Sequence, residues 1–205
     1  GLVLEDGILL ASGDGATFGP VCDNNFDVED AQVACRHLGS LRAERYWIQQ
    51  SSPFVPSSYT VDGLACSGSE QNLGSCVWSA PGACGENEMI RLECTNASVS
   101  LALAEGILMA GIGDGPLGPV CDEGFDSADA RVACRHLGYL RAVSYRAGRT
   151  VASISGAFTM TRLRCFGEEQ TLGECWFEAP ESCGRDRMIA LTCTDQPVRD
   201  AAIFS

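Results

Sequence analysis

The sequence VCDNNFDVEDAQVACRHLG at residues 21–39 decides the fold, because it returns at residues 120–138 as VCDEGFDSADARVACRHLG. The two stretches lie 99 residues apart, and all twelve cysteines keep this offset. The first set is Cys22, Cys35, Cys66, Cys76, Cys84 and Cys94, and the second is Cys121, Cys134, Cys165, Cys175, Cys183 and Cys193. The chain is therefore two copies of one cysteine-rich unit.

Six cysteines in each unit indicate disulfide-bonded domains that fold outside the reducing cytosol. Zinc is the other use of so many cysteines, but the chain lacks the C-x2-C pairs that zinc fingers and ribbons use. Aligning the repeats predicts domain 1 at residues 1–96, domain 2 at residues 97–195 and a C-terminal tail at residues 196–205.

Each copy contains one clear helix. In the first copy Asp27 is a good N-cap, apolar residues follow with helical spacing, and Gly39 suits the position after the helix. We expect Asp30 to act as a first-turn acid on the helix dipole. The second copy predicts a helix that starts at residue 126 or 127 and ends at residue 138.

Strands and a second, shorter helix are predicted around this main helix. The strands are expected at 2–10, 16–22, 59–66 and 89–94, and again at 99–109, 116–121, 158–165 and 188–193. The short helix should follow Gly68 and end near Cys76. One or two helices against an antiparallel sheet is an α+β fold.

Charge and composition exclude several classes of function. The net charge is −13, with 13 acids against 4 arginines in residues 1–96 and 14 acids against 10 arginines in residues 97–205. Nucleic acid is a poor partner for such a surface. The chain has no lysine, which excludes Schiff-base chemistry. No apolar run is long enough to span a bilayer, so any membrane contact is expected through segments outside this chain. Because the chain starts at Gly1 without a signal peptide, we expect a processed form or a piece of a larger protein.

The two quoted stretches, followed by Cys66-Ser67-Gly68-Ser69-Glu70 and Cys165-Phe166-Gly167-Glu168-Glu169, resemble the scavenger receptor cysteine-rich domain of the six-cysteine type. The resemblance covers almost all of both units. It implies two tandem domains, each with a curved antiparallel sheet that cradles one main helix. Proline replaces the family's frequent threonine at positions 20 and 119, and phenylalanine replaces its frequent tryptophan at positions 26 and 125. These departures suggest a divergent branch.

The resemblance also implies a disulfide pairing, which counting cannot supply because six cysteines allow 15 connectivities. The implied pairs are Cys22–Cys84, Cys35–Cys94 and Cys66–Cys76 in domain 1, and Cys121–Cys183, Cys134–Cys193 and Cys165–Cys175 in domain 2.

The family often carries a cation site built from two acids after the first cysteine and a glutamate near the last strand. Domain 1 holds Asp23, Asn24 and Glu88 at these positions, which are oxygen ligands of the kind that calcium takes. Domain 2 holds Asp122, Glu123 and Arg187, where a guanidinium would replace the metal by an internal salt bridge. We therefore expect weak calcium binding in domain 1 alone and no other cofactor; the alternative is that the acids are merely solvated.

Domain 2 also has arginines that domain 1 lacks. They could bind sulfated or carboxylated polymers through forked hydrogen bonds. They could instead form a solvated face balanced by Glu168, Glu169 and Glu174, or meet an acidic surface of a neighbouring molecule. The set is Arg141, Arg146, Arg149, Arg162 and Arg164.

Other motifs say less about function. His37 and His136 stand at helix C-termini, where the dipole favours a cation, so we expect a structural role. Asn96-Ala97-Ser98 is an N-glycosylation sequon between the domains. The chain has no G-x-S-x-G motif, and paired cysteines leave no obvious catalytic thiol, so we expect no enzyme activity.

The sequence thus favours a non-enzymatic extracellular ligand-recognition module, in a receptor ectodomain or a secreted protein. Its ligand would be an extracellular protein or a polyanionic glycan. Two alternatives stay open: a self-associating component of an extracellular matrix, fibre or cell-surface complex, and accessory domains of a larger secreted enzyme.

Overall fold

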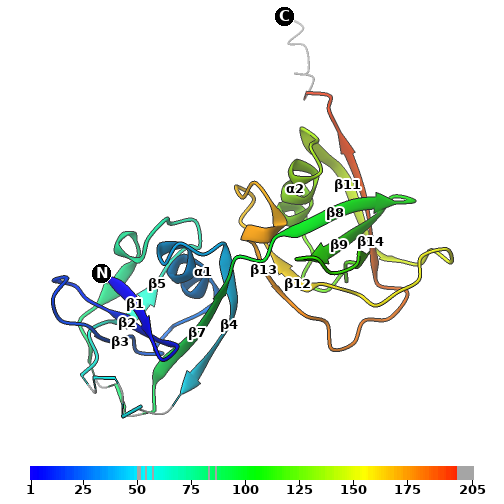
Figure 1. Ribbon diagram of the computed structural model, residues 1–205. Coiled ribbons are helices and arrows are strands. Elements are labelled where there is room, and N and C mark those ends of the chain that lie inside the picture. The colour runs from blue at the N-terminus through cyan, green and yellow to red at the C-terminus, as the bar shows by residue number, and fades with distance from the viewer. Residues whose placement is uncertain (50–51, 54, 57, 83, 86, 198–205) are drawn as a thin grey trace, which may run out of the picture. The chain divides into compact units, whose positions relative to one another are not determined.

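The computed structural model describes residues 1–49, 52–53, 55–56, 58–82, 84–85 and 87–197 (Figure 1). It divides into two compact units, Gly1–Asn96 and Ala97–Ser205, called domain 1 and domain 2 below. Of the expected tail at 196–205, only residues 196 and 197 lie among the described residues. No helix in this described part of the chain is long and apolar enough to cross a bilayer.

Domain 1 is an α+β domain built on a five-stranded antiparallel sheet. The strand order is β1-β2-β7-β4, and β3 pairs with β2. A second, two-stranded sheet joins β5 and β6. The elements are β1 (Leu2–Glu5), β2 (Ile8–Ala11), β3 (Gly19–Pro20), α1 (Val28–His37), β4 (Arg42–Gln49), β5 (Asp62–Ala65), the 3-10 turn η1 (Leu73–Ser75), β6 (Val77–Ser79) and β7 (Met89–Thr95).

Domain 2 repeats this arrangement, so the predicted fold class is confirmed. Its sheet has the order β10-β9-β14-β11, with β8 paired to β9, and β12 pairs with β13. The elements are β8 (Val99–Ala104), β9 (Ile107–Ile112), β10 (Gly118–Pro119), α2 (Ser127–His136), β11 (Arg141–Arg149), β12 (Thr161–Arg164), the 3-10 turn η2 (Leu172–Glu174), β13 (Trp176–Glu178) and β14 (Met188–Thr194).

Two features of the sheets differ from the predicted strands. The strands expected at 2–10 and 99–109 are hairpins. Asp6 and Gly7 (φ 50° and 76°) turn the chain between β1 and β2, and Glu105 and Gly106 (φ 51° and 79°) turn it between β8 and β9. The long strands β4 and β11 were not predicted at all, although each pairs with the last strand of its domain. The short helix expected before Cys76 is only the single turn η1.

The predicted main helix is present, with Asp27 as its N-cap and Gly39 at a φ of 83° after its end. Asp30 lies in the first turn of the helix as expected, and it has a second role that the sequence did not predict. Its side chain is fully buried, and its two oxygens accept hydrogen bonds from the amides of Asp27 (2.9 Å) and Cys66 (2.8 Å). Asp129 makes the same two bonds to Asp126 and Cys165 in domain 2. Each carboxylate therefore joins the start of the helix to a distant loop.

Six disulfides enclose these cores, and they are the same six pairs that the family resemblance implied. In each domain two bridges span 62 and 59 residues and one spans 10 residues. By the loop-entropy relation the long loops are worth about 4 kcal/mol each and the short loop about 3 kcal/mol. A surface ion pair contributes only about 0–1 kcal/mol, so the bridges outweigh it.

The buried carboxylates predict how stability depends on pH. Burial is the main cause that raises the pKa of Asp30 and of Asp129 from 3.8 to about 7. The folded protein keeps these protons up to about pH 7, whereas the unfolded chain releases them near pH 3.8. The resulting stabilisation is full below pH 3.8 and is lost as the pH rises towards 7.

In the parent protein the unfolding free energy should fall between pH 4 and pH 7.5. We expect Asp30→Asn and Asp129→Asn each to make this fall smaller, by up to about 4 kcal/mol. Guanidinium unfolding with the disulfides intact would measure it. The two histidines act in the opposite direction, since burial lowers their pKa values, but they are common to parent and variants. Identical pH slopes for parent and variants would contradict the prediction.

Candidate functional site

Three carboxylates surround the Cys22–Cys84 disulfide of domain 1. Asp23 directly follows the bridge, Asp62 begins β5, and Glu88 directly precedes β7. Backbone hydrogen bonds bring them together. The amide of Cys22 donates to the main-chain carbonyl of Val61, just before Asp62 (2.9 Å), and the amide of Asp23 donates to the main-chain carbonyl of Glu88 (3.0 Å). Oxygens of Asp23 and Glu88 lie within 4.8 Å of each other and of the Cys22 sulfur, and an Asp62 oxygen lies within 4.8 Å of both sulfurs.

The chemistry of this acidic cluster suits a hard cation. The sulfurs are bonded to each other and offer no thiolate, so the carboxylate and amide oxygens are the ligands. Burial first, and then the negative charges of Glu88 and Asp62, raise the pKa of Asp23. Hydrogen bonds from the Asn24 side chain and the Gly82 amide lower the pKa of Asp62. A cation would relieve the repulsion that the carboxylates exert on Asp23.

Asn24 and Glu88 already have partners inside this cluster. Asn24 donates its amide nitrogen to Asp62 Oδ1 (3.0 Å), and Glu88 Oε2 accepts from the amide of Gly85 (2.7 Å). Asp62 was missed by the sequence reasoning, because it stands 39 residues after Asp23 and is brought here by the bridge between Val21 and Val61, just before β5.

The equivalent place in domain 2 holds internal cations. Arg187 Nε lies 2.7 Å from Asp122 Oδ1, which is the salt bridge that the sequence predicted. Glu123 is engaged by Arg162 at 3.0 Å, a contact that the sequence did not predict. Threonine stands at position 161, the equivalent of Asp62. The same backbone thus carries an acidic cluster in domain 1 and neutralised ion pairs in domain 2.

Three of the predicted arginines share one face of the domain 2 sheet. Arg141, Arg146 and Arg149 lie opposite residues 194, 190 and 188 of β14, which alternate along one side of that strand. A bulge at Gly148, with a φ of 70°, brings Arg149 onto this side. Tyr145 faces the other side and packs edge-to-face against Phe125 beneath α2, with ring centroids 5.4 Å apart.

This arginine face, defined by Arg141, Arg146 and Arg149, is not neutralised by its own sheet. Neither β11 nor β14 contains an acidic residue. Within the described part of the chain, no ion pair involves Arg146 or Arg149, and both are exposed. Arg141 is half-buried and donates Nε to the Gln196 carbonyl (3.0 Å). The expectation that domain 1 lacks this arginine is wrong, because Arg42 stands at the equivalent position.

The other two predicted arginines lie apart from this face, on β12. Arg162 and Arg164 are both exposed and alternate with buried residues, as expected for one side of a strand. Arg162 is held by Glu123 (3.0 Å) and Glu178 (3.2 Å). The alternative of a solvated face balanced by three glutamates does not hold for Glu169, because this residue is buried and accepts hydrogen bonds from the amides of residues 166 and 167.

The two histidines are hydrogen-bond acceptors at the helix ends. Nδ1 of His37 accepts from the amide of Leu73, and Nδ1 of His136 accepts from Leu172, both at 3.2 Å. Burial is the main cause that lowers both pKa values. The expectation that the helix dipole favours the cation here is therefore wrong, because the neutral ring holds the 3-10 turn.

A family model for the scavenger receptor cysteine-rich (SRCR) domain matches residues 7–95 and 103–194. The chain belongs to the SRCR domain family. SRCR domains are extracellular ligand-recognition modules, and the family consists in general of recognition domains rather than enzymes.

The SRCR relatives include proteins of known sequence and of known structure. A scavenger receptor cysteine-rich domain superfamily protein of Patiria pectinifera is 30% identical over 192 residues, which cover 89% of this chain and 17% of the relative. The dimeric form of the SRCR domain of mouse MARCO is 23% identical and covers 48% of this chain and 87% of its own, with a TM-score of 0.37. The third SRCR domain of murine neurotrypsin is 25% identical and covers 49% and 98%, with a TM-score of 0.41.

Asn96 is exposed at the end of domain 1, and its Oδ1 accepts from the Leu41 amide (2.9 Å). A glycan attaches to the other atom of the amide group, Nδ2, so this hydrogen bond can persist after modification. We expect the chain secreted from eukaryotic cells to carry one N-glycan, seen as a mass loss after enzymatic deglycosylation. Asn96→Gln and Ser98→Ala should both abolish the loss; a loss that survives both would contradict the assignment.

Proposed function

We propose that this chain is a non-enzymatic recognition module of a secreted protein or cell-surface ectodomain, and that it binds polyanions through the arginine face of domain 2. The ligand class is sulfated or carboxylated glycan. The observation that carries the proposal is the placement of Arg141, Arg146 and Arg149 on one side of two strands that contain no acid. Guanidinium groups suit this task because their planar fork binds sulfate or carboxylate through two parallel hydrogen bonds.

The equivalent face of the domain 1 sheet supports the proposal, because its arginine is neutralised by an acid of the neighbouring strand. There Arg45 is paired with Glu93 of the neighbouring strand, through Nε–Oε2 at 2.5 Å and Nη2–Oε1 at 3.0 Å. The Arg45 guanidinium also lies 5.0 Å from the ring centroid of Trp47. In domain 2 the position of Glu93 is Thr192, and the position of Trp47 is Arg146. Domain 1, at a net charge of −9, would in addition repel a polyanion.

The asymmetry between the domains gives a matched test. Arg146→Gln/Arg149→Gln should weaken binding of the whole chain to heparin-type sulfated oligosaccharide by about tenfold or more, because it removes two charge-assisted contacts. Arg45→Gln/Arg91→Gln changes the net charge equally in domain 1 and should leave binding within about twofold.

Isothermal titration at several salt concentrations is the measurement, since the parent and the domain 1 variant should share a steeper salt dependence than the domain 2 variant. Equal losses in both variants would contradict the arginine face. Concentration-dependent self-association of a chain that does not bind the oligosaccharide would favour the structural alternative instead.

A weak calcium site in domain 1 is a second candidate, favoured by the acidic cluster. Asp23, Glu88 and the Asn24 carbonyl would hold the ion, with Asp62 beside them. Bound calcium would supply a positive charge that can bridge to an acidic ligand. Domain 2 is not expected to share this site, because Arg187 already neutralises Asp122.

Equilibrium dialysis of the intact chain should find one bound calcium ion per chain. The variants Asp23→Asn and Glu88→Gln should each abolish this binding. Asp122→Asn alters the equivalent acid of domain 2 and should leave the calcium stoichiometry unchanged. Uptake that persists in both domain 1 variants, or a stoichiometry of two ions in the parent, would refute the assignment to domain 1.

A further inference from the structure

Domain 2 has an open pocket of about 500 Å³ between α2 and β11, called the edge pocket below. Ala130 and Arg131 of the helix form one wall, and Arg141, Ala142 and Tyr145 of the strand form the other. In the described part of the chain β11 is the outermost strand of its sheet, so one side of its backbone has no partner strand. The edge pocket therefore places two arginines beside backbone that the sheet leaves open.

Domain 1 closes the equivalent place with its own side chain. Gln32 of α1 is 1% exposed, and its Oε1 accepts a hydrogen bond from the amide of Ala43 in β4 (2.6 Å). Ala43 is 0% exposed, whereas its equivalent in domain 2, Ala142, is half-buried. The carboxamide of Gln32 thus shows which chemical group fits against this strand edge.

Arginine replaces this glutamine in domain 2, at position 131. A guanidinium has no acceptor atom, so Arg131 cannot repeat the hydrogen bond that Gln32 makes. The guanidinium carbon of Arg131 lies 3.4 Å from the place of a Cβ atom at Gly167, so the side chain turns towards that loop. Arg131 is exposed, and within the described residues no ion pair engages it. The place of the carboxamide is therefore open in domain 2, with a cation beside it.

Strand register aims the open backbone amide into the edge pocket. Ala142 lies opposite Cys193, as Ala43 lies opposite Cys94 in domain 1. In both domains the register then shifts at the next residue of the edge strand. Because the pairing is the same, the amide of Ala142 points to the place where domain 1 holds the oxygen of Gln32.

A second exchange removes an acid from the same place. In domain 1, burial is the main cause that lowers the pKa of Arg42, and the nearby charge of Glu44 acts against it. Domain 2 has Val143 at the position of Glu44, and this valine is 54% exposed. Among the described residues that line the edge pocket there is no acid. Both exchanges make the domain 2 site more positive, which favours an anion.

We propose that the edge pocket binds the carboxylate of an acidic sugar. One carboxylate oxygen takes the place of the Gln32 oxygen and accepts from the Ala142 amide, and the other oxygen faces Arg131. A carboxylate fits better than a sulfate, because it is planar like the carboxamide that fills the place in domain 1. The inference rests on the proposed function and gives one carboxylated unit of the glycan a defined place, since Arg141 belongs both to the edge pocket and to the arginine face.

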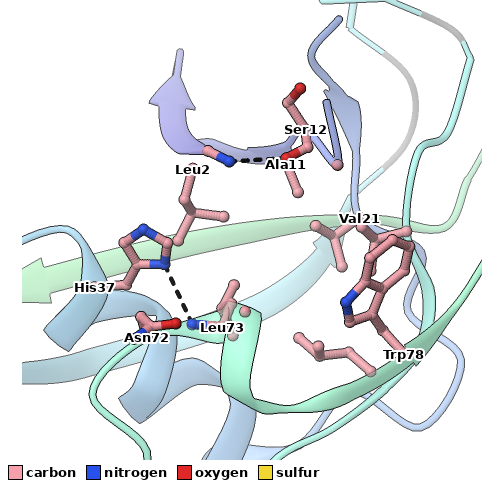
Figure 2. A pocket seen from close by; sticks show the side chains of 13 residues that line it. Leu2, Ala11, Ser12, Val21, His37, Asn72, Leu73 and Trp78 are labelled. Carbon is pink, nitrogen blue, oxygen red and sulfur yellow. Dashed lines mark hydrogen bonds between the residues drawn. The ribbon is translucent and has the colours of Figure 1, made fainter. Parts of the chain in front are cut away.

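The pocket of domain 1 lies elsewhere and is a poor alternative for an anion (Figure 2). Leu2, Val21 and Trp78 give it apolar walls, and among the described residues that line it there is no arginine. His37 lines it too, but its Nδ1 accepts from the Leu73 amide, and burial lowers its pKa. A neutral histidine offers a carboxylate no charge, so we expect the sugar to bind in domain 2.

The test titrates the whole, isotope-labelled chain with an unsulfated oligosaccharide that contains glucuronate. The amide resonance of Ala142 should shift, and the same oligosaccharide with its carboxyl groups reduced to alcohols should not shift it. Arg131→Gln should weaken binding by about tenfold or more, because the new glutamine can cover the amide as Gln32 does and a guanidinium is lost. Val143→Glu changes an exposed side chain and should weaken binding through charge repulsion.

Arg185→Gln is the matched control, because it removes one exposed arginine outside the edge pocket and should leave the affinity within about twofold. Equal binding of the reduced oligosaccharide, or an unchanged affinity in Arg131→Gln, would overturn the proposal. A glutamate-rich peptide that shifts Ala142 when the oligosaccharide does not would overturn the assignment to a sugar.

The variant Arg146→Gln/Arg149→Gln separates this inference from the proposed function. If the edge pocket is wrong and the arginine face is right, the double variant weakens binding of the sulfated oligosaccharide while Arg131→Gln leaves the glucuronate affinity unchanged. If the arginine face alone is wrong, the double variant leaves binding of the sulfated oligosaccharide unchanged, and Arg131→Gln still weakens binding of the glucuronate oligosaccharide.

Discussion

In each domain one buried carboxylate joins the start of the helix to the cysteine that opens the short disulfide loop. In domain 1, Asp30 accepts hydrogen bonds from the amides of Asp27 and of Cys66, which lies 36 residues after Asp30, so it fixes where Cys66 stands against α1. The η1 turn follows within that loop and is held by His37 at the other end of the same helix. The disulfides restrict the conformations of the unfolded chain, whereas the hydrogen bonds of Asp30 order the loop in the folded chain. Burial of the Asp30 carboxyl group at this contact is the main cause that raises its pKa.

On this common frame the two domains place their charged residues differently. Around the first bridge, domain 1 gathers Asp23, Asp62 and Glu88, whereas domain 2 neutralises Asp122 with Arg187. On the sheet, Glu93 neutralises Arg45 in domain 1, whereas the arginine face of domain 2 has no acid in its strands. Exchanging a few polar residues is enough, because the buried apolar residues that hold each strand in place differ little between the copies. Repetition of one fold thus produces two surfaces with different distributions of charge.

Local signals in the sequence predicted the main helix, and the cysteine repeat predicted two disulfide-bonded domains. Asp27 and Gly39 are capping residues whose effect depends only on their neighbours, so they could be read directly. The hairpin at Asp6-Gly7 carried a known turn signal that was overlooked. The strand β4 could not be found in the same way, because its residues RAERYWIQ mix charge and aromatic rings without strict alternation. Asp30 and Asp62 gained their roles from contacts 36 and 38 residues away along the chain, which no local pattern shows.

If the two domains share one frame and differ in the arginine face, a polyanion should contact domain 2 and leave domain 1 free. The most direct measurement is amide chemical-shift mapping of the whole, isotope-labelled chain during titration with a sulfated oligosaccharide. We expect shifts concentrated in β11 and β14, with the equivalent strands β4 and β7 of domain 1 unchanged. Shifts of equal size in β4 and β7, or shifts that avoid β11, would contradict it.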